Sequence, residues 1–285
     1  MSESPGTPSS PLWRRVPERV GGVISSSIDS LRTTISYVGG VLQLLLDVIA
    51  RVRRGLTTRG ARISGDALIR QAVRVGVRSI PIIVLVQLFI GIILALNMAP
   101  TLASYGQIEA VADVVAIAIF RELGPLITGI VLSGFAGASI AAELGTMVEG
   151  EEIKALRAHA LDPIRFLIVP RVLATTVMTI GLAIVADVVG VTGGFITGVF
   201  ILDISPQTYI DNTQAILTTR DYLTGLFKAA VFGVIIAGIA SYEGLNVRGG
   251  AEGVGRATTA TVVKTIVALI GADCIFTAVF YKLGW

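Results

Sequence analysis

The sequence predicts an all-α integral membrane protein with about five transmembrane helices. Charged residues make up only 15% of its 285 residues, whereas a soluble domain carries about 25%. The charges are missing from long blocks: none occurs between Arg78 and Glu109, and about 20 apolar residues suffice to cross the hydrocarbon layer. Basic residues gather at one end, with 12 of the 23 before residue 79, which is typical of a cytoplasmic segment beside a membrane span.

The N-terminal part is expected to stay outside the hydrocarbon layer. Residues 1–20 are rich in Ser and Pro and lack the apolar core of a signal peptide, so a disordered cytoplasmic tail is expected. In residues 21–78, apolar side chains from Ile24 to Ile49 recur at steps of three and four, and a run of arginines follows. This pattern favours an N-terminal amphipathic helix lying in the membrane surface. A soluble coiled-coil segment is the alternative.

Residues 79–285 are expected to form the transmembrane domain. The five expected spans are 79–98, the long region 108–147, 172–202, 222–242 and 261–281. The segments 149–171, 203–221 and 243–259 are expected as loops, the first with a short helix and the last as a flexible glycine-rich turn. Pro125 is expected to kink or break the second span, because proline removes a helical hydrogen bond and clashes with the preceding turn.

Charge asymmetry predicts the orientation. With the N-terminus inside, the cytoplasmic segments hold 19 of the 23 basic residues and the outer segments hold two. The positive-inside rule therefore favours a cytoplasmic N-terminus and an external C-terminus, which requires an odd number of crossings.

Several kinds of catalytic or cofactor site are excluded. The chain has no Gly-Lys pair and therefore no P-loop for ATP. Its one histidine, His159, argues against a histidine metal site or a Ser-His-Asp triad, and its one cysteine, Cys274, rules out an internal disulfide. We expect no catalytic residue, cofactor or metal in this chain. The basic N-terminal part is interpreted as facing anionic lipid and not nucleic acid.

Two stripes of small residues recur at intervals of four, which places each stripe on one helix face. They are Ser133, Gly137, Ala141 and Gly145 in the second span and Gly190, Gly194 and Gly198 in the third. Small residues at this spacing let helices approach closely in lipid. Each stripe is interpreted either as a packing contact within the chain or as a contact between two copies.

Five charged residues fall inside the expected spans. They are Arg121, Glu122, Asp187, Lys228 and Asp273. Each costs about 2.5–3.5 kcal/mol at a helix centre on the insertion scale, so such residues usually face a cavity or one another. Two interpretations stay open: a polar lining or latch along a substrate path, and a structural network of ion pairs that orients the helices.

The loop 149–171 is a second candidate functional region. Its short amphipathic helix presents charged and apolar side chains together, which suits docking of a cytosolic partner. The residues concerned are Glu151, Glu152, Ile153, Leu156 and Arg157, with Asp162 and Pro163 at the end of the segment.

Ordered motifs across residues 30–283 resemble the MlaE/YrbE family of permeases. They are Arg121-Glu122-Leu123-Gly124-Pro125, Ala141-Ala142-Glu143-Leu144-Gly145-Thr146-Met147, Glu151-Glu152-Ile153 through Leu161-Asp162-Pro163, Val169-Pro170-Arg171-Val172-Leu173-Ala174, Gly253-Val254-Gly255-Arg256-Ala257-Thr258-Thr259 and Thr261-Val262-Val263.

The resemblance implies a permease subunit of an ABC transporter that moves phospholipids or related lipids between the bacterial inner membrane and the outer envelope. It implies two copies of the chain, a cytosolic ATPase dimer that binds ATP and Mg, and a periplasmic MCE-domain protein. Residues 151–160 would be the coupling helix on the ATPase. Arg121, Glu122, Lys228 and Asp273 fall where similar proteins carry functional charges, and Arg256 matches the pattern in a cytoplasmic loop, whereas Asp187 does not fit it.

Two other functions were weighed against this one. A proton-coupled secondary transporter would use Asp187, Glu122 and Asp273 as a relay, although no inverted repeat is evident. A membrane scaffold would have little reason to bear the cost of buried charges.

Overall fold

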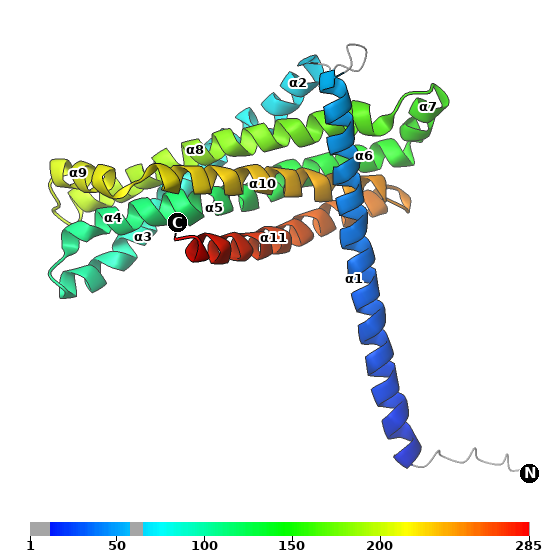
Figure 1. The fold of residues 1–285 in the computed structure, drawn as a ribbon, viewed down its shortest axis with the longest axis horizontal. Helices are drawn as coiled ribbons and strands as arrows, with labels where there is room; N and C mark the ends of the chain where they lie inside the picture. The colour runs from blue at the N-terminus through cyan, green and yellow to red at the C-terminus, as the bar shows by residue number, and fades with distance from the viewer. Residues whose placement is uncertain (1–11, 58–64, 285) are drawn as a thin grey trace, which may run out of the picture. The chain divides into compact units, whose positions relative to one another are not determined.

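The computed structural model describes residues 12–57 and 65–284, with side chains for 32–54 and 65–284. Within these ranges every regular element is helical (Figure 1), which confirms the expected all-α membrane class. The chain divides after Leu44 into two units, each of which is treated by itself.

The first helix is long. Helix α1 covers Leu12–Thr57, so it begins inside the stretch expected as a disordered tail, while residues 1–11 lie outside the described residues. Its segment Arg32–Arg54 is long and apolar enough to cross a membrane. The structure thus contains six candidate spans in its described part, one more than expected. The surface location expected for this segment stays a prediction.

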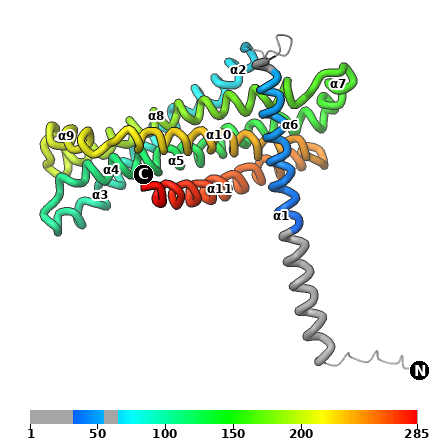
Figure 2. The backbone as a smooth tube through the Cα atoms, in the orientation of Figure 1, coloured from blue at the N-terminus to red at the C-terminus, as the bar shows by residue number. Residues whose placement is uncertain are grey.

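The second unit contains the remaining helices, whose backbone Figure 2 traces. They are α2 (Gly65–Val75), α3 (Ile80–Ser104), α4 (Val111–Ala118), α5 (Gly124–Leu132), α6 (Ala138–Glu149), α7 (Glu152–Ala158), α8 (Val169–Phe200), α9 (Pro206–Ile216), α10 (Thr219–Leu245) and α11 (Gly250–Lys282). Five candidate spans within them coincide with the five expected regions. The loop expected at 203–221 contains α9, which begins after Ser205, whose Oγ accepts from the Thr208 amide at 3.1 Å.

Pro125 was expected to kink or break the second span, and a break is wrong. Residues Ile108–Glu149 form one helical segment, which widens into a π-helix at Ile119–Leu123, just before the proline. There the Gly124 amide donates to the Ile119 carbonyl five residues back. Because the π-helix shifts the hydrogen-bond register, the helix continues although Pro125 has no amide hydrogen to donate. The simple rule that proline ends a helix does not consider such a shift.

The expected flexible turn at 243–259 is also wrong. The turn itself needs only Gly249 and Gly250, whose φ angles of 96° and 67° lie in the left-handed region. Helix α11 starts at Gly250, so Arg256 lies in its second turn and not in a loop. The later glycines lie within α11, which buries one face made of Gly253, Ala257, Thr261, Thr265 and Leu269.

The core of the second unit forms around α8, which packs against α3, α5 and α10. Leu182 of α8 is buried with Leu132, Phe232 and Ile236 from the neighbouring helices. The α3 and α8 backbones touch: a Cβ atom on Gly91 would lie 1.9 Å from the Gly190 carbonyl oxygen. Glycine is therefore required where these two helices cross.

Both small-residue stripes contact helices of the same chain. Gly137 faces Ile236 of α10 and Thr261 of α11 at contact distance. Gly194 and Gly198 lie against Tyr209 of α9. All six glycine and alanine positions proposed for packing are buried in the single chain. These contacts favour the interpretation of both stripes as packing within the chain.

A substitution at the α3–α8 crossing should destabilise the protein. In Gly193→Ala the new methyl group would lie 2.3 Å from the Leu88 carbonyl oxygen, and main-chain atoms move only with the whole helix. We expect a loss of about 1–3 kcal/mol, measured as a lower unfolding midpoint of the purified chain. Gly181→Ala in the same helix is the control, because no atom lies within 4 Å of its new Cβ. Equal midpoints for both variants would contradict the crossing geometry.

Candidate functional site: an intramembrane charge cluster

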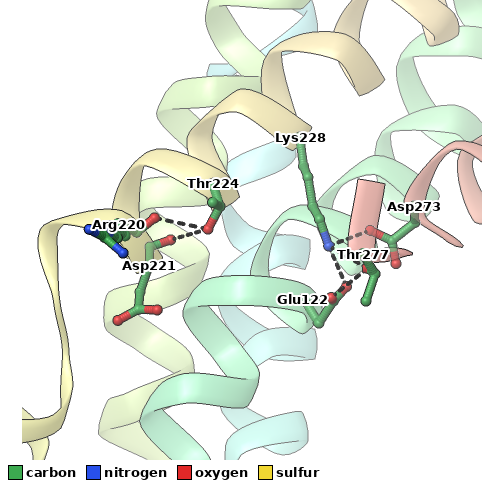
Figure 3. Close-up of polar contacts among 7 residues, drawn as sticks. All are labelled: Glu122, Arg220, Asp221, Thr224, Lys228, Asp273 and Thr277. Carbon is green, nitrogen blue, oxygen red and sulfur yellow. Dashed lines mark hydrogen bonds and ion pairs between the residues drawn. The ribbon is translucent and has the colours of Figure 1, made fainter. Parts of the chain in front are cut away.

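Four polar residues from three spans meet inside the second unit, and we call them the charge cluster: Glu122, Lys228, Asp273 and Thr277 (Figure 3). The Lys228 ammonium donates to Glu122 Oε2 at 2.7 Å and to Thr277 Oγ1 at 3.0 Å. It also forms an ion pair with Asp273 Oδ1 at 2.9 Å. The Thr277 hydroxyl donates to Glu122 Oε1 at 2.7 Å. The cluster is therefore closed by contacts among its own members.

The local structure of each helix places these side chains. Glu122 sits in the π-helix Ile119–Leu123, where the wider turn changes the direction of side chains relative to an α-helix. Lys228 comes from α10, whose Gly225 lies so close to the Phe120 carbonyl oxygen that a Cβ atom would be 2.2 Å from it. This close contact fixes the position of Lys228 along the helix axis relative to Glu122. Asp273 and Thr277 are four residues apart on α11, so they share one face.

An aromatic group packs α10 against α11 beside the charge cluster. The rings of Phe227 and Phe276 have centroids 5.5 Å apart in an edge-to-face arrangement. Phe280 stacks on Phe276 with centroids 6.2 Å apart. Such pairs add to the burial of apolar surface and hold the two helices on which Lys228 and Asp273 stand.

The charge cluster contains two acidic residues and one basic residue. Lys228 is only 1% exposed and is the single cation among its members, whereas Glu122 and Asp273 are both acids. A buried ammonium without partners is very costly, so the two carboxylates make its location tolerable. The cluster can hold one lysine tightly while leaving a carboxylate partly exposed, since Glu122 keeps 34% of its side-chain surface accessible.

Arg121 does not join this cluster. Its guanidinium forms an ion pair with Asp221 at the start of α10. Asp221 is buried and also accepts from the Thr218 amide at 2.7 Å, as part of a capping box. The expectation that the intramembrane charges face one another thus holds for Glu122, Lys228 and Asp273, while Arg121 pairs with a residue expected in a loop.

Asp187 stands apart from the other charges. It is 4% exposed, and its Oδ1 has no hydrogen-bond partner in the described part of the chain. That oxygen lies against the Cα of Gly124, where a Cβ atom would be 1.8 Å away. The side chain therefore packs against the backbone beside the π-helix and Pro125 and does not pair with Lys228.

A small cavity opens beside the charge cluster. It measures about 120 Å³ and is lined by residues of the cluster together with Arg121, Thr224, Phe280 and Tyr281. Helix α11, which supplies two members of the cluster, is the least covered span of the second unit, with 11% of its apolar window buried against 61% for α10. One side of the cluster is thus close to the surface of the chain.

The predicted helix in the loop 149–171 is confirmed as α7. Ile153 is its buried anchor, while Glu151, Glu152 and Arg157 are exposed and Leu156 is half-buried. Two non-glycine residues with left-handed backbone flank it, Glu151 with φ 58° and Ala160 with φ 57°.

The end of this loop is tied down at Asp162. Arg51 Nε donates to Asp162 Oδ2 at 2.6 Å, and Pro163 is buried. Partial burial acts to raise the pKa of Asp162, but the hydrogen bond and charge of Arg51 outweigh it and lower that pKa. The exposed side chains of α7 are thus held on a well-anchored segment.

Sequence reasoning missed three kinds of partner. Asp221 falls in the segment expected as a loop, although Thr218 three residues earlier is the signal of a helix start. Thr277 carries no charge and gave no signal. Glu143 pairs with Arg74 at 2.8 Å and with Arg171 at 3.0 Å, and only their shared location in the fold reveals that set.

Removing the cation should destabilise the fold by leaving two carboxylates together. We expect Lys228→Met to cost about 3 kcal/mol, measured as a lower unfolding midpoint, and Glu122→Gln with Asp273→Asn in the same chain to restore part of it. Lys154→Met is the matched control, since its pair with Glu151 at 2.7 Å is exposed and worth little. Additive effects of the three substitutions would show that the cluster does not act as a unit.

Comparisons with known proteins agree with this architecture. A family model described as Permease MlaE matches residues 68–279. A probable ABC transporter permease protein of Rickettsia prowazekii (strain Madrid E) is 37% identical over 216 residues, which cover 76% of this chain and 83% of that protein. The intermembrane phospholipid transport system permease protein MlaE of Haemophilus influenzae is 33% identical over 218 residues, covering 76% and 84%.

A plant relative shows how far the similarity extends. The chloroplastic protein TRIGALACTOSYLDIACYLGLYCEROL 1 of Arabidopsis thaliana is 32% identical over 235 residues, which cover 82% of this chain and 65% of that protein. Residues 68–279, which the family model matches, contain the charge cluster and the loop with α7. The family model spans most of the second unit, the Rickettsia prowazekii relative is named a probable ABC transporter permease and the Haemophilus influenzae relative is named MlaE. This multi-pass inner-membrane chain therefore belongs to the MlaE permease family.

Proposed function

We propose that this chain is the membrane subunit of an ATP-driven transporter that moves phospholipids between the inner membrane and the outer envelope. It acts as a homodimer with a cytosolic ATPase dimer, which binds ATP and Mg, and with a periplasmic MCE-domain protein. The observation that carries the proposal is the charge cluster, which joins three spans through Lys228 next to the little-covered helix α11. The phospholipid-transport name of the Haemophilus influenzae relative supports the substrate class.

The size of the cavity argues that lipid is held between two copies. The cavity beside the charge cluster has a volume of about 120 Å³, whereas even drug-sized ligands occupy pockets of about 300–1,000 Å³. A phospholipid held beside the charge cluster therefore needs more space than one chain encloses at that place. The little-covered face of α11 would form one side of this space, and a second copy of the chain would form the other side.

The charge cluster acts as a latch in this proposal. Lys228 binds Glu122 of the second span and Asp273 of α11, so separating these helices breaks ion pairs inside the membrane. ATP-driven closure of the ATPase dimer reaches the spans through α7 and shifts the balance between a latched and an open arrangement. Lipid drives transport in one direction only if its affinity differs between the two arrangements.

The proton-relay alternative has less support. Two of its three carboxylates, Glu122 and Asp273, are engaged by Lys228. The third, Asp187, packs against Gly124 and forms no ion pair in the part of the chain that the structure describes. A relay needs a continuous path of exchangeable protons, and these contacts do not supply one.

The orientation also follows the proposal. A cytoplasmic N-terminus and a periplasmic C-terminus, with α1 lying in the membrane surface, would put α7 in the cytoplasm beside the ATPase. The charge cluster would then lie toward the periplasm.

Transport by the assembled complex tests the latch. Lys228→Ala should abolish transport of labelled phospholipid between vesicles while the subunits still co-purify, and Thr277→Val should reduce it severalfold, because it removes the hydroxyl that bridges Lys228 and Glu122. Lys282→Ala, an exposed lysine near the end of the same helix α11, is the control and should transport normally. Normal transport by Lys228→Ala would remove the latch.

Co-purification tests the docking role of α7. Arg157→Glu and Leu156→Asp reverse or add charge on the accessible face of the helix, so the amount of bound ATPase should fall at least tenfold. Lys282→Glu, on the opposite side of the membrane in the proposed orientation, should leave it unchanged. An ATPase that still binds both α7 variants fully would place its docking surface elsewhere.

A further inference from the structure

Two adjoining cavities lie away from the charge cluster, between α2, α6 and the start of α8. Their volumes are about 490 and 360 Å³. Both are lined by Gln71, Arg74, Arg78 and Glu143, and we call them together the arginine pocket. Glu122 and Glu143 belong to one helical segment, so the pocket lies roughly 30 Å along the span from the charge cluster at about 1.5 Å per residue. It is at the end where α7 joins α6 to α8 (Figure 1).

The arginine pocket has an excess of positive charge. Four arginines line it: Arg70, Arg74, Arg78 and Arg171. The one acid among the lining residues, Glu143, is shared by Arg74 and Arg171. Arg70 and Arg78 have no carboxylate partner among the described residues, and their spacing of four from Arg74 puts all three on one face of the α2 region.

Two buried donors in the pocket have no acceptor. Gln71 is 8% exposed and Arg171 is 7% exposed, yet Gln71 Nε2 and Arg171 Nε have no hydrogen-bond partner in the described part of the chain. A buried donor without a partner is destabilising, and native proteins rarely leave one. Gln71 and Arg171 line the same cavities as Arg70 and Arg78. Such a set of donor residues suits an anion with several oxygens, and phosphate fits this chemistry.

The rest of the lining is apolar. Phe135, Ala136 and Ile140 line one cavity, and Phe166, Leu167 and Pro170 line the other. Beside the arginine face, α2 and its extension carry an exposed apolar stripe of Ile69, Val73 and Val77. A free phosphate ion gains nothing from such walls, whereas a phosphate attached to acyl chains buries those chains against them.

We propose that the arginine pocket binds the phosphate group of a glycerophospholipid from the adjacent leaflet, with the acyl chains along the apolar walls. This is a second lipid site, on the α7 side of the membrane. A role of this site in loading or releasing the transported lipid rests on the proposed transport function. The binding of lipid to the pocket does not rest on it.

Photolabelling of the full chain in dodecyl maltoside micelles, which contain no phosphate, tests the site. The probe is a phosphatidylglycerol with a diazirine near the glycerol end of one acyl chain. Labelled peptides should cover residues 67–79 and 135–147. Arg70→Gln with Arg78→Gln should cut this labelling about tenfold, since two charge-assisted contacts are lost while both ion pairs of Glu143 remain. Arg248→Gln, an exposed arginine outside both cavities, is the matched control.

Competition separates the sources of phosphate. Unlabelled phosphatidylglycerol should displace the probe, while diacylglycerol and glycerol 3-phosphate should not. Equal displacement by glycerol 3-phosphate would assign the pocket to a soluble phosphate compound and overturn the lipid proposal. Equal labelling of the double variant and the Arg248→Gln control would overturn the site itself.

The outcome is independent of the transport test. Lys228→Ala leaves the arginine pocket intact and should be labelled like the wild-type chain even when transport is lost. If the assembled complex moves no phospholipid but the pocket is labelled as expected, the proposed function fails and the site stands.

Discussion

The structure depends on one ammonium group held between two carboxylates inside the membrane. Lys228 is almost fully buried, and an unpaired charge at that depth would cost more than a single helix contact returns. Its contacts with Glu122 and Asp273 therefore determine which faces of three spans meet. The glycine contact at Gly225, the π-helix beside Pro125 and the aromatic packing of α10 on α11 all serve to place these charges within hydrogen-bond distance.

The π-helix explains why a proline is found beside the most polar part of the second span. Proline cannot donate a hydrogen bond, and in lipid no water replaces it. The widened turn shifts the register, and the Phe120 carbonyl oxygen lies against the Cα of Gly225. The same local change that tolerates Pro125 also points Glu122 toward α10, so the backbone irregularity and the polar site are one feature.

The sequence was sufficient for the five spans of the second unit, for α7 and for the meeting of Glu122, Lys228 and Asp273, because hydropathy and buried charge impose strong constraints in lipid. It did not predict the sixth candidate span, within α1. It was not sufficient where geometry decides. Pairing of Arg121 with Asp221 requires the helix start at Thr218, and the union of Arg74, Arg171 and Glu143 joins residues far apart in the chain. The continuous second span and the early start of α11 depend on backbone arrangements that residue propensities alone do not reveal.

The backbone at the two ends of α7 has a mechanical consequence. Glu151 and Ala160 carry side chains yet adopt left-handed conformation, a narrow region for such residues. At such residues the backbone dihedral angles can vary little, whereas at glycine they can vary widely. A force applied to α7 would therefore displace α6 and α8 together with it. Little of the movement would be taken up by conformational change in the connecting residues.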